Sequence, residues 1–393
     1  MTTPTITARN EPHAPAGRSR GNRRQSLLAI LCAIALAVAL VPHATDLVSG
    51  NTFSTALVLT CPVALAALGG VWAERAGVVN IGLEGTMILG TWGAGFGALQ
   101  WGPALGLVFG MACGALGGLV HAVVTVTFKV DHIVAGVAIN ILAPGVAKYL
   151  SSLTFAAMPG GGTTQSPPVP ALPVLPLPFG LGGLSTGIVL GLVLFPLSWW
   201  LLWRTPYGLR LRFCGENPVA ATSLGIRVTV LRYGAVVSSG ALAGLGGALL
   251  VLASSGLYRD GQTAGRGYMG LAATVFGNWT PSGAFAGSLL YGYMDALQLR
   301  GGGSAVRTVL VVAALVCGLL AVLVILRRGG LRRLAFPALA AILLATVTAL
   351  TDSVPEQVAF VAPYVAVLVA LVLSGQRLRP PAALGKRHDI ASS

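Results

Sequence analysis

Long apolar stretches recur along nearly the whole chain and are separated by short polar segments. Most approach the roughly 20 residues that a helix needs to cross a bilayer. They lie near residues 26–42, 53–72, 82–100, 103–128, 133–155, 182–203, 233–255, 264–278, 281–299, 307–326, 334–351 and 357–375. Because only helices and closed barrels satisfy their backbone groups in lipid, the pattern predicts an all-α polytopic membrane protein with about 12 transmembrane helices. The short stretch 264–278 is expected to be a broken or re-entrant element.

Composition agrees with a membrane protein. Charged residues make up 9% of the 393 residues and hydrophobic residues 55%, and the mean hydropathy is +0.81. A soluble domain carries about 25% charged residues. The net charge of +14 comes from short basic clusters between apolar stretches and not from one basic face. The lipid bilayer is therefore the expected partner, and nucleic acid is not.

The basic clusters also predict orientation. With the N-terminus inside, most of the 25 lysines and arginines fall in cytoplasmic segments, as the positive-inside rule requires. We expect cytoplasmic basic tails at 1–25 and 377–393 around a transmembrane domain at 26–376. The first apolar stretch fits a cleavable signal or a retained helix. The Val-Pro-His-Ala sequence after it is a poor cleavage site and favours the helix.

Two loops differ from the others. Residues 158–180, expected outside, are rich in proline, which predicts an extended segment, either a linker, which we favour, or a surface for an external partner. Residues 204–232, expected inside, contain the signals of a short helix. Asn217 is a good N-cap, Pro218 suits the first position and Gly225 can follow the C-cap. On these signals alone, a docking helix and a plain basic loop are equally favoured.

Glycine recurs every four residues in two places. The two series are Gly106, Gly110, Gly114 and Gly118, and Gly183, Gly187 and Gly191. Such spacing leaves one face of a helix bare, so that neighbouring helices approach closely in lipid. It predicts a tightly packed bundle.

The stretch from Glu74 to Gly90 places charged and amide side chains between two apolar stretches. A charge at bilayer depth costs about 3 kcal/mol even on lenient scales, so such groups line a protein interior or an aqueous pathway. Asn80 and Glu84 are four residues apart and would share a helix face if that segment is helical, while Gly77, Gly82 and Gly85 permit a break. In the alternative interpretation, Glu74 and Arg75 form an ion pair at the inner mouth and Glu84 satisfies a neighbouring helix.

Further polar residues are candidates for the same pathway. Gln262 and its neighbours border 264–278 on the expected outer side, while Trp279, at the other end, is interpreted as an interfacial anchor. Asn140 lies within an apolar stretch, where a helix-packing hydrogen bond is favoured. The candidate pathway residues are Asn80, Glu84, Asn140, Thr263, Arg266, Tyr268 and Asp295.

No signature of catalysis or cofactor binding is present. The sequence lacks GxxxxGK[ST], and its five cysteines and five histidines are scattered without metal-ligand spacing. We expect no catalytic residue, no metal site and no bound cofactor. If ATP drives this protein, a partner hydrolyses it.

Several blocks together resemble a known family, the membrane permeases of the branched-chain amino acid, ribose and nucleoside group of bacterial ABC importers, in its nucleoside or simple-sugar branch. The blocks are Glu74-Arg-Ala-Gly-Val-Val-Asn-Ile-Gly-Leu-Glu-Gly85, Tyr207-Gly-Leu-Arg-Leu-Arg212, Gly215-Glu-Asn-Pro-Val-Ala-Ala221, Thr263-Ala-Gly-Arg-Gly-Tyr-Met-Gly-Leu-Ala-Ala-Thr-Val-Phe-Gly277, Asp295-Ala-Leu-Gln-Leu-Arg300, Ala362-Pro-Tyr364 and Pro381-Ala-Ala-Leu-Gly-Lys386.

The resemblance implies a permease subunit of the bacterial plasma membrane that imports substrate by alternating access. Its implied partners are an ATPase subunit that binds ATP and Mg, a second permease in a heterodimer, and an extracellular substrate-binding lipoprotein. Nucleosides are the favoured substrates, then simple sugars, then branched-chain amino acids. Residues 307–351 are interpreted as two helices added to a family core of about 10, with Arg327, Arg328, Arg332 and Arg333 in the turn between them.

The resemblance also assigns roles to residues. It implies that the stretch from Glu74 to Gly85 is a broken helix near the pathway and that 204–232 holds the helix that fits the ATPase. The implied coupling residues are Gly215, Glu216, Asn217, Pro218, Gly225 and Ile226. The opposing class is an ion-coupled secondary transporter, which acidic groups at membrane depth and interrupted helices also fit. A channel or scaffold is the third class.

Overall fold

The computed structural model describes residues 49–176, 183–326, 331–350, 361, 363–365 and 378–386. The expected N-terminal tail, the apolar stretch 26–42, most of 357–375, and residues 377 and 387–393 of the expected C-terminal tail lie outside these residues. The described residues fall into two compact units, one made of 307–326 and 331–350 and the other of the remainder. The first unit coincides with the expected added helix pair.

Long helices make up the larger unit. They are α2 (Gly50–Arg75), α3 (Leu83–Trp101), α4 (Pro103–Ala122) continued by the π-helix η2 (Val123–Thr127), α5 (His132–Thr154), α6 (Thr186–Arg204), and α9 (Val228–Leu249) continued by η3 (Leu250–Ser255). Within the described residues, five of them are long and apolar enough to cross a membrane, namely α2, α4 with η2, α5, α6 and α9 with η3. The predicted all-α polytopic class is confirmed.

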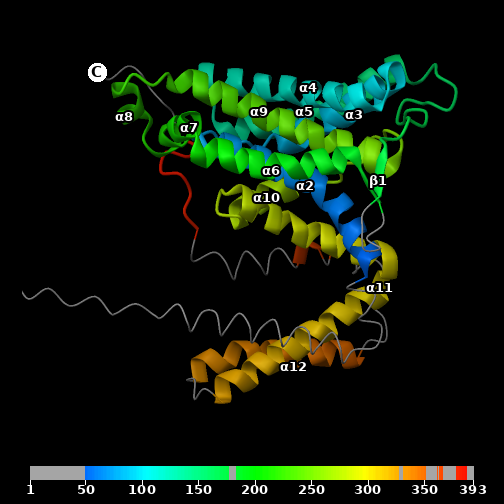
Figure 1. The fold of residues 1–393 in the computed structure, drawn as a ribbon, viewed down its shortest axis with the longest axis vertical. Coiled ribbons are helices and arrows are strands. Elements are labelled where there is room, and N and C mark those ends of the chain that lie inside the picture. Colours follow the sequence, from blue (N-terminus) through cyan, green and yellow to red (C-terminus); the bar gives the residue numbers. More distant parts are fainter. Residues whose placement is uncertain are drawn as a thin grey trace, which may run out of the picture. The chain divides into compact units, whose positions relative to one another are not determined.

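Shorter elements complete the unit. They are α7 (Pro206–Glu216), α8 (Pro218–Ser223), α10 (Arg266–Phe276), and the strands β1 (Val174–Pro176) and β2 (Gly183–Ser185), which pair antiparallel. With 11 residues, α10 is about 16 Å long and too short to cross a bilayer. Figure 1 shows α7 and α8 at one end of the long helices and β1 at the other.

The last described helices differ in detail from expectation. The stretches 281–299 and 307–326 both lie in α11 (Pro281–Leu326), and the non-helical Gly302, with φ 52° and ψ −138°, divides α11 into two helices at a kink, as the two stretches predicted. Arg332 and Arg333, expected in a turn, lie in α12 (Leu331–Leu350). Arg327 and Arg328 lie outside the described residues.

Glycine contacts hold the bundle together. A Cβ on Gly114 would lie 2.4 Å from the carbonyl oxygen of Gly240, and one on Gly118 would lie 2.7 Å from that of Val236. Such distances bring the backbones of α4 and α9 into contact, so the predicted close approach is confirmed (Figure 1). The second series was wrong at its start, because Gly183 pairs in β2 and only Gly187 and Gly191 lie on α6.

The described part of the proline-rich loop is extended and attached to the bundle. Ser166 donates its backbone N–H to the carbonyl of Tyr258, and Val169 donates to that of Gly256. Gln165 forms an antiparallel bridge with Arg259. The loop therefore packs along the segment that follows η3.

Candidate functional site

The chain breaks its helical path between α2 and α3. Residues 76–82 are not helical, and Gly77 has φ +91°, a conformation that favours glycine. Leu83, the first residue of α3, packs against Ala66 of α2. Ala66 lies about 14 Å along α2 from its end at Arg75, close to half the thickness of a bilayer core. In a spanning helix that ends at the bilayer surface this position corresponds to mid-depth, where the sequence predicts a broken helix.

Side chains from neighbouring helices satisfy the backbone of this break. His132 accepts from the N–H of Val79, and the His121 ring bonds the Val79 carbonyl. Arg232 donates to the carbonyl of Ala76 at 3.2 Å. Because irregular backbone at membrane depth needs protein partners, these buried polar side chains have a structural reason to be there.

Asn140 of α5 hydrogen-bonds the backbone on both sides of the point where the break leads into α3. Its Oδ1 accepts from the N–H of Gly85 at 2.7 Å, and its Nδ2 donates to the carbonyl of Ile81 at 2.9 Å. The favoured interpretation of Asn140 as a helix-packing residue agrees with these contacts. A substrate contact by Asn140 stays a prediction.

Asn80 and Glu84 do not share a helix face. Asn80 lies in the break, fully buried, where its Nδ2 donates to Ser239 Oγ at 2.8 Å. Glu84 lies in the first turn of α3. A shared face required the segment to be helical, and the break that the glycines permit is present instead.

Glu84 instead joins α3 to α10. Its Oε1 accepts from Thr263 Oγ1 at 2.6 Å and from the N–H of Gly265 at 3.0 Å. Its Oε2 accepts from the N–H of Gly267 at 2.7 Å. The carboxylate therefore caps the first turn of α10, whose own N-cap residue, Gly265, has no side chain to do so. Satisfying a neighbouring helix was the alternative expected for Glu84.

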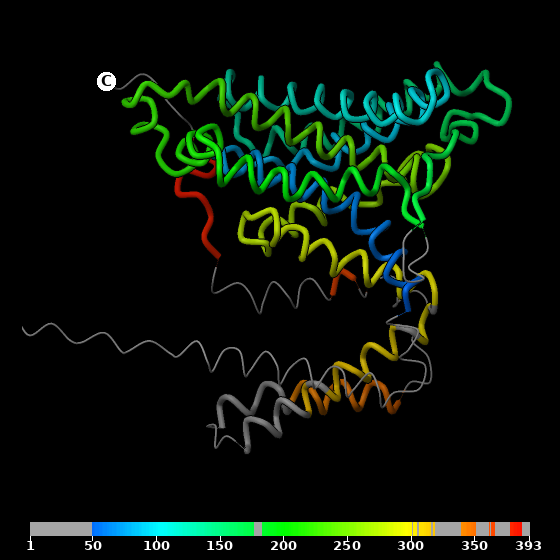
Figure 2. The backbone as a smooth tube through the Cα atoms, in the orientation of Figure 1, coloured from blue at the N-terminus to red at the C-terminus, as the bar shows by residue number. Residues whose placement is uncertain are grey.

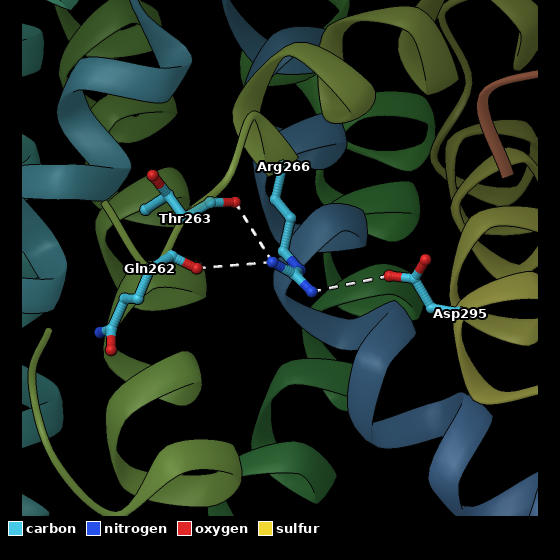
Figure 3. A network of polar contacts seen from close by, with 4 residues as sticks. All are labelled: Gln262, Thr263, Arg266 and Asp295. Carbon is cyan, nitrogen blue, oxygen red and sulfur yellow. Dashed lines mark hydrogen bonds and ion pairs between the residues drawn. The ribbon is translucent and has the colours of Figure 1, made fainter. Parts of the chain in front are cut away.

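Arg266 extends this network toward α11, as Figure 3 shows. Its Nη1 donates to the carbonyls of Gln262 and Thr263, each at 3.4 Å, and its Nη2 lies 3.6 Å from Asp295 Oδ2. The side chains of Arg266 and Asp295 are 20% and 17% exposed, so this part of the network is accessible. Four sequence candidates, Glu84, Thr263, Arg266 and Asp295, thus meet in one place, while Tyr268 is 48% exposed.

The inner-mouth ion pair expected between Glu74 and Arg75 was wrong. Glu74 accepts from Trp279 Nε1, while Arg75 donates to the carbonyls of Trp279 and Asn278 at 2.7 and 3.2 Å. Both side chains thus hold the turn after α10. Trp279 is only 5% exposed and is not an interfacial anchor.

A second cluster lies at the α8 end of the bundle. Asn217 Oδ1 accepts from the N–H of Ala220 at 3.0 Å, Pro218 is the first residue of α8, and Gly225 has φ +75°. The predicted capped helix is confirmed. Val219 and Leu224 are 65% and 72% exposed, so α8 presents apolar side chains to its surroundings.

Residues 378–386 connect the two clusters, which sequence reasoning missed. The N–H of Ala383 donates to the carbonyl of Gly215 at 2.9 Å, and that of Gly385 donates to the carbonyl of Gly77 at 3.1 Å. Ala382 donates to Glu216 Oε2 and Arg379 to Asn278 Oδ1. Figure 2 shows this red segment beside α7. Backbone donors carry all four bonds, so the sequence marked Pro381 to Lys386 only as a block of the family resemblance and gave no sign of what the segment contacts.

Comparison with known proteins identifies the family. The family model described as branched-chain amino acid transport system, permease component, matches residues 52–325. The guanosine ABC transporter permease protein NupQ of Bacillus subtilis is 39% identical over 262 residues, which cover 62% of this chain and 81% of the relative.

Two other relatives extend the comparison. The nucleoside ABC transporter permease protein NupC of Lactococcus lactis is 38% identical over 63% of this chain and 81% of its own length. The putative glucose ABC transporter permease protein TsgC13 of Haloferax volcanii is 37% identical over 60% and 73%. No solved structure matches. The resemblance seen in the sequence is confirmed, and the chain belongs to the permease family of branched-chain amino acid transport systems.

Proposed function

We propose that this chain is the membrane-spanning permease subunit of an ATP-driven importer of nucleosides. The similarity to guanosine and nucleoside permeases carries this proposal. The chain works with a separate ATPase, which binds ATP and Mg, with a second permease in a heterodimer and with an extracellular substrate-binding lipoprotein. It has no catalytic role of its own, and both of its termini face the cytoplasm of the bacterial cell.

The geometry of α8 supports coupling to the ATPase. A six-residue helix is marginal alone, but α8 is capped at Asn217 and anchored where Cys214, Ala221 and Val228 pack together. Its exposed Val219 and Leu224 offer apolar contacts to a groove on a partner. The coupling residues are Gly215, Glu216, Asn217, Pro218, Gly225 and Ile226.

The route from α8 to the pathway is short. A Cβ on Gly215 would lie 2.2 Å from the carbonyl oxygen of Arg75, so α7 touches the end of α2. Residues 378–386 bond both Gly215 and Gly77. A displacement of α8 by the ATPase would therefore reach the break, and through Glu84 it would reach α10.

The mid-depth network supports recognition of an uncharged polar substrate. Asp295 accepts and Arg266 donates hydrogen bonds, and both are partly exposed. A nucleoside offers ribose hydroxyls and ring nitrogens that match such groups. We assign the pathway to Asn80, Glu84, Asn140, Thr263, Arg266, Tyr268 and Asp295.

Uptake by the reconstituted complex tests the function. We expect ATP-dependent accumulation of radiolabelled guanosine in proteoliposomes that contain this chain, its partner permease, the ATPase and the binding protein. Accumulation of glucose or leucine in place of guanosine would show that the substrate is a sugar or an amino acid and not a nucleoside. Uptake by this chain alone under a proton or sodium gradient would overturn the ATP-driven mechanism.

A charge on α8 tests the coupling. Val219→Asp is expected to prevent copurification of the ATPase and to abolish uptake, while the permease still inserts. The control is Val174→Asp, which adds the same charge to a valine of similar exposure, 62% against 65%, at the opposite end of the helices. Normal copurification with Val219→Asp would refute α8 as the docking element.

A further inference from the structure

A small polar pocket opens where η2, the turn before α5 and the first turn of α9 meet. Its polar wall is formed by Thr125, Lys129, His132, Thr229 and Arg232, and we call this set the basic pocket. None of the residues that line it is acidic. None of its residues belongs to the Glu84 network, and the proposed transport cycle assigns no ligand to it, although His132 and Arg232 also support the break between α2 and α3.

Arg232 brings a buried positive charge to this wall. The residue is 4% exposed, its Nε donates to the carbonyl of Ala76, and its Nη2 has no hydrogen-bond partner among the described residues. A buried charged donor without a partner carries a large desolvation cost. An anion in the pocket would offset that cost.

The other walls also favour an anion. His132 Nδ1 accepts from the N–H of Val79, so the neutral ring carries its proton on Nε2 as a donor. Lys129 adds an ammonium group. No side chain caps the N-terminus of the 22-residue α9, and the N–H of Val228, its first residue, donates to the carbonyl of Ile226. Thr229, the second residue, lines the pocket, so the positive end of the helix dipole lies beside it.

We propose that the basic pocket binds a phosphate-bearing anion, either the headgroup of an anionic lipid or free inorganic phosphate. A guanidinium, an ammonium and a helix N-terminus are the donors that phosphate groups use in proteins. Basic pockets at the ends of membrane helices hold lipid headgroups. Exposed apolar side chains lie beside the pocket for acyl chains to contact, with Phe128 70% and Ile133 55% exposed. The inference does not depend on the proposed function.

Binding to the full chain tests the proposal. The protein is purified in detergent, depleted of lipid, and titrated with phosphatidylglycerol, phosphatidylcholine or inorganic phosphate while native mass spectra and melting temperature are recorded. We expect phosphatidylglycerol or inorganic phosphate to bind and to raise the melting temperature. Phosphatidylglycerol alone identifies a lipid site, and inorganic phosphate alone identifies a free-anion site.

Three variants locate the binding. Lys129→Gln removes one charge from the pocket and is expected to weaken binding about tenfold, the loss of one charge-assisted hydrogen bond. Arg210→Gln removes the same charge from an exposed position on α7 outside the pocket and should bind as the unmodified chain does. Arg232→Gln is the stronger test where it folds. Binding of neither phosphate probe, or equal binding by the Lys129 and Arg210 variants, would overturn the proposal.

Discussion

Glu84 accepts a 2.7 Å hydrogen bond from the backbone N–H of Gly267, so a carboxylate on the first turn of α3 also caps the first turn of α10. Two interrupted helices thereby present their positive ends to one negative charge near mid-depth. The arrangement explains why a charged residue lies at a depth where charge is costly.

Replacing Glu84 by glutamine should loosen this junction. Glu84→Gln keeps the size of the side chain but removes the charge that accepts from Thr263, Gly265 and Gly267. We expect a loss of about 1–3 kcal/mol of stability, measured by unfolding in detergent. Thr263→Val is the graded control, because it removes one of the three bonds and should cost less. An unchanged melting temperature for Glu84→Gln would show that the cap contributes nothing.

Adding one methyl group to the contact between α4 and α9 should destabilise the protein. Gly114→Ala places a Cβ 2.4 Å from a backbone carbonyl that has no room to move, and we expect about 1–3 kcal/mol of destabilisation. Gly145→Ala is the matched control on α5, where nothing lies within 4 Å of the added atom. Equal melting temperatures for the two variants would contradict the packing argument.

The C-terminal segment should be needed for uptake but not for insertion. A chain that ends at Arg377 loses the bonds to Gly77, Gly215, Glu216 and Asn278. We expect correct membrane insertion with at least a severalfold loss of ATP-driven uptake. A chain that ends at Lys386 keeps all four bonds and is the control. If both truncations transport equally, the segment does not link the coupling region to the break.

The thiol of Cys214 should make stability depend on pH. Burial raises the pKa of this thiol on α7 above its ordinary value, although Arg232 opposes the shift. The folded chain therefore keeps the proton that the unfolded chain loses, so the thiol's contribution is complete below about pH 9 and declines above it. The limit of the decline is about 1.4 kcal/mol per pH unit.

Unfolding in denaturant between pH 8 and pH 10.5 measures this effect. Cys214→Ala lacks this thiol's contribution to the loss of unfolding free energy at alkaline pH. The unfolding free energies of the unmodified chain and of the variant should therefore converge as pH rises. Parallel curves would show that Cys214 has the same pKa in both states.

Much of the fold follows from local sequence. The apolar stretches fixed the class and position of the helices, and the Asn217, Pro218 and Gly225 signals gave α8 with its caps, because capping and proline effects act within a few residues. The glycine repeat from Gly106 to Gly118 likewise gave a close helix contact, although not its partner.

The candidate site was less predictable. Its residues Glu84, Thr263, Arg266 and Asp295 were each singled out by their polarity in an apolar context, but their roles depended on which backbone groups they reach. For Asn80 both a helical position and a position in a break were open, because helical spacing cannot show where a glycine-rich helix stops. Trp279 was misplaced because its partner, Glu74, is far away in sequence.

The sequence by itself therefore determined the membrane class, the capped helix and the residues with a reason to be functional, since hydrophobicity and capping are local properties. Only the tertiary structure decided that Glu84 caps α10, that Arg232 and His132 support the break, and that residues 378–386 bond Gly77 and Gly215. These contacts satisfy backbone groups left open where a helix is interrupted in the membrane, and their partners come from distant segments that no local pattern connects.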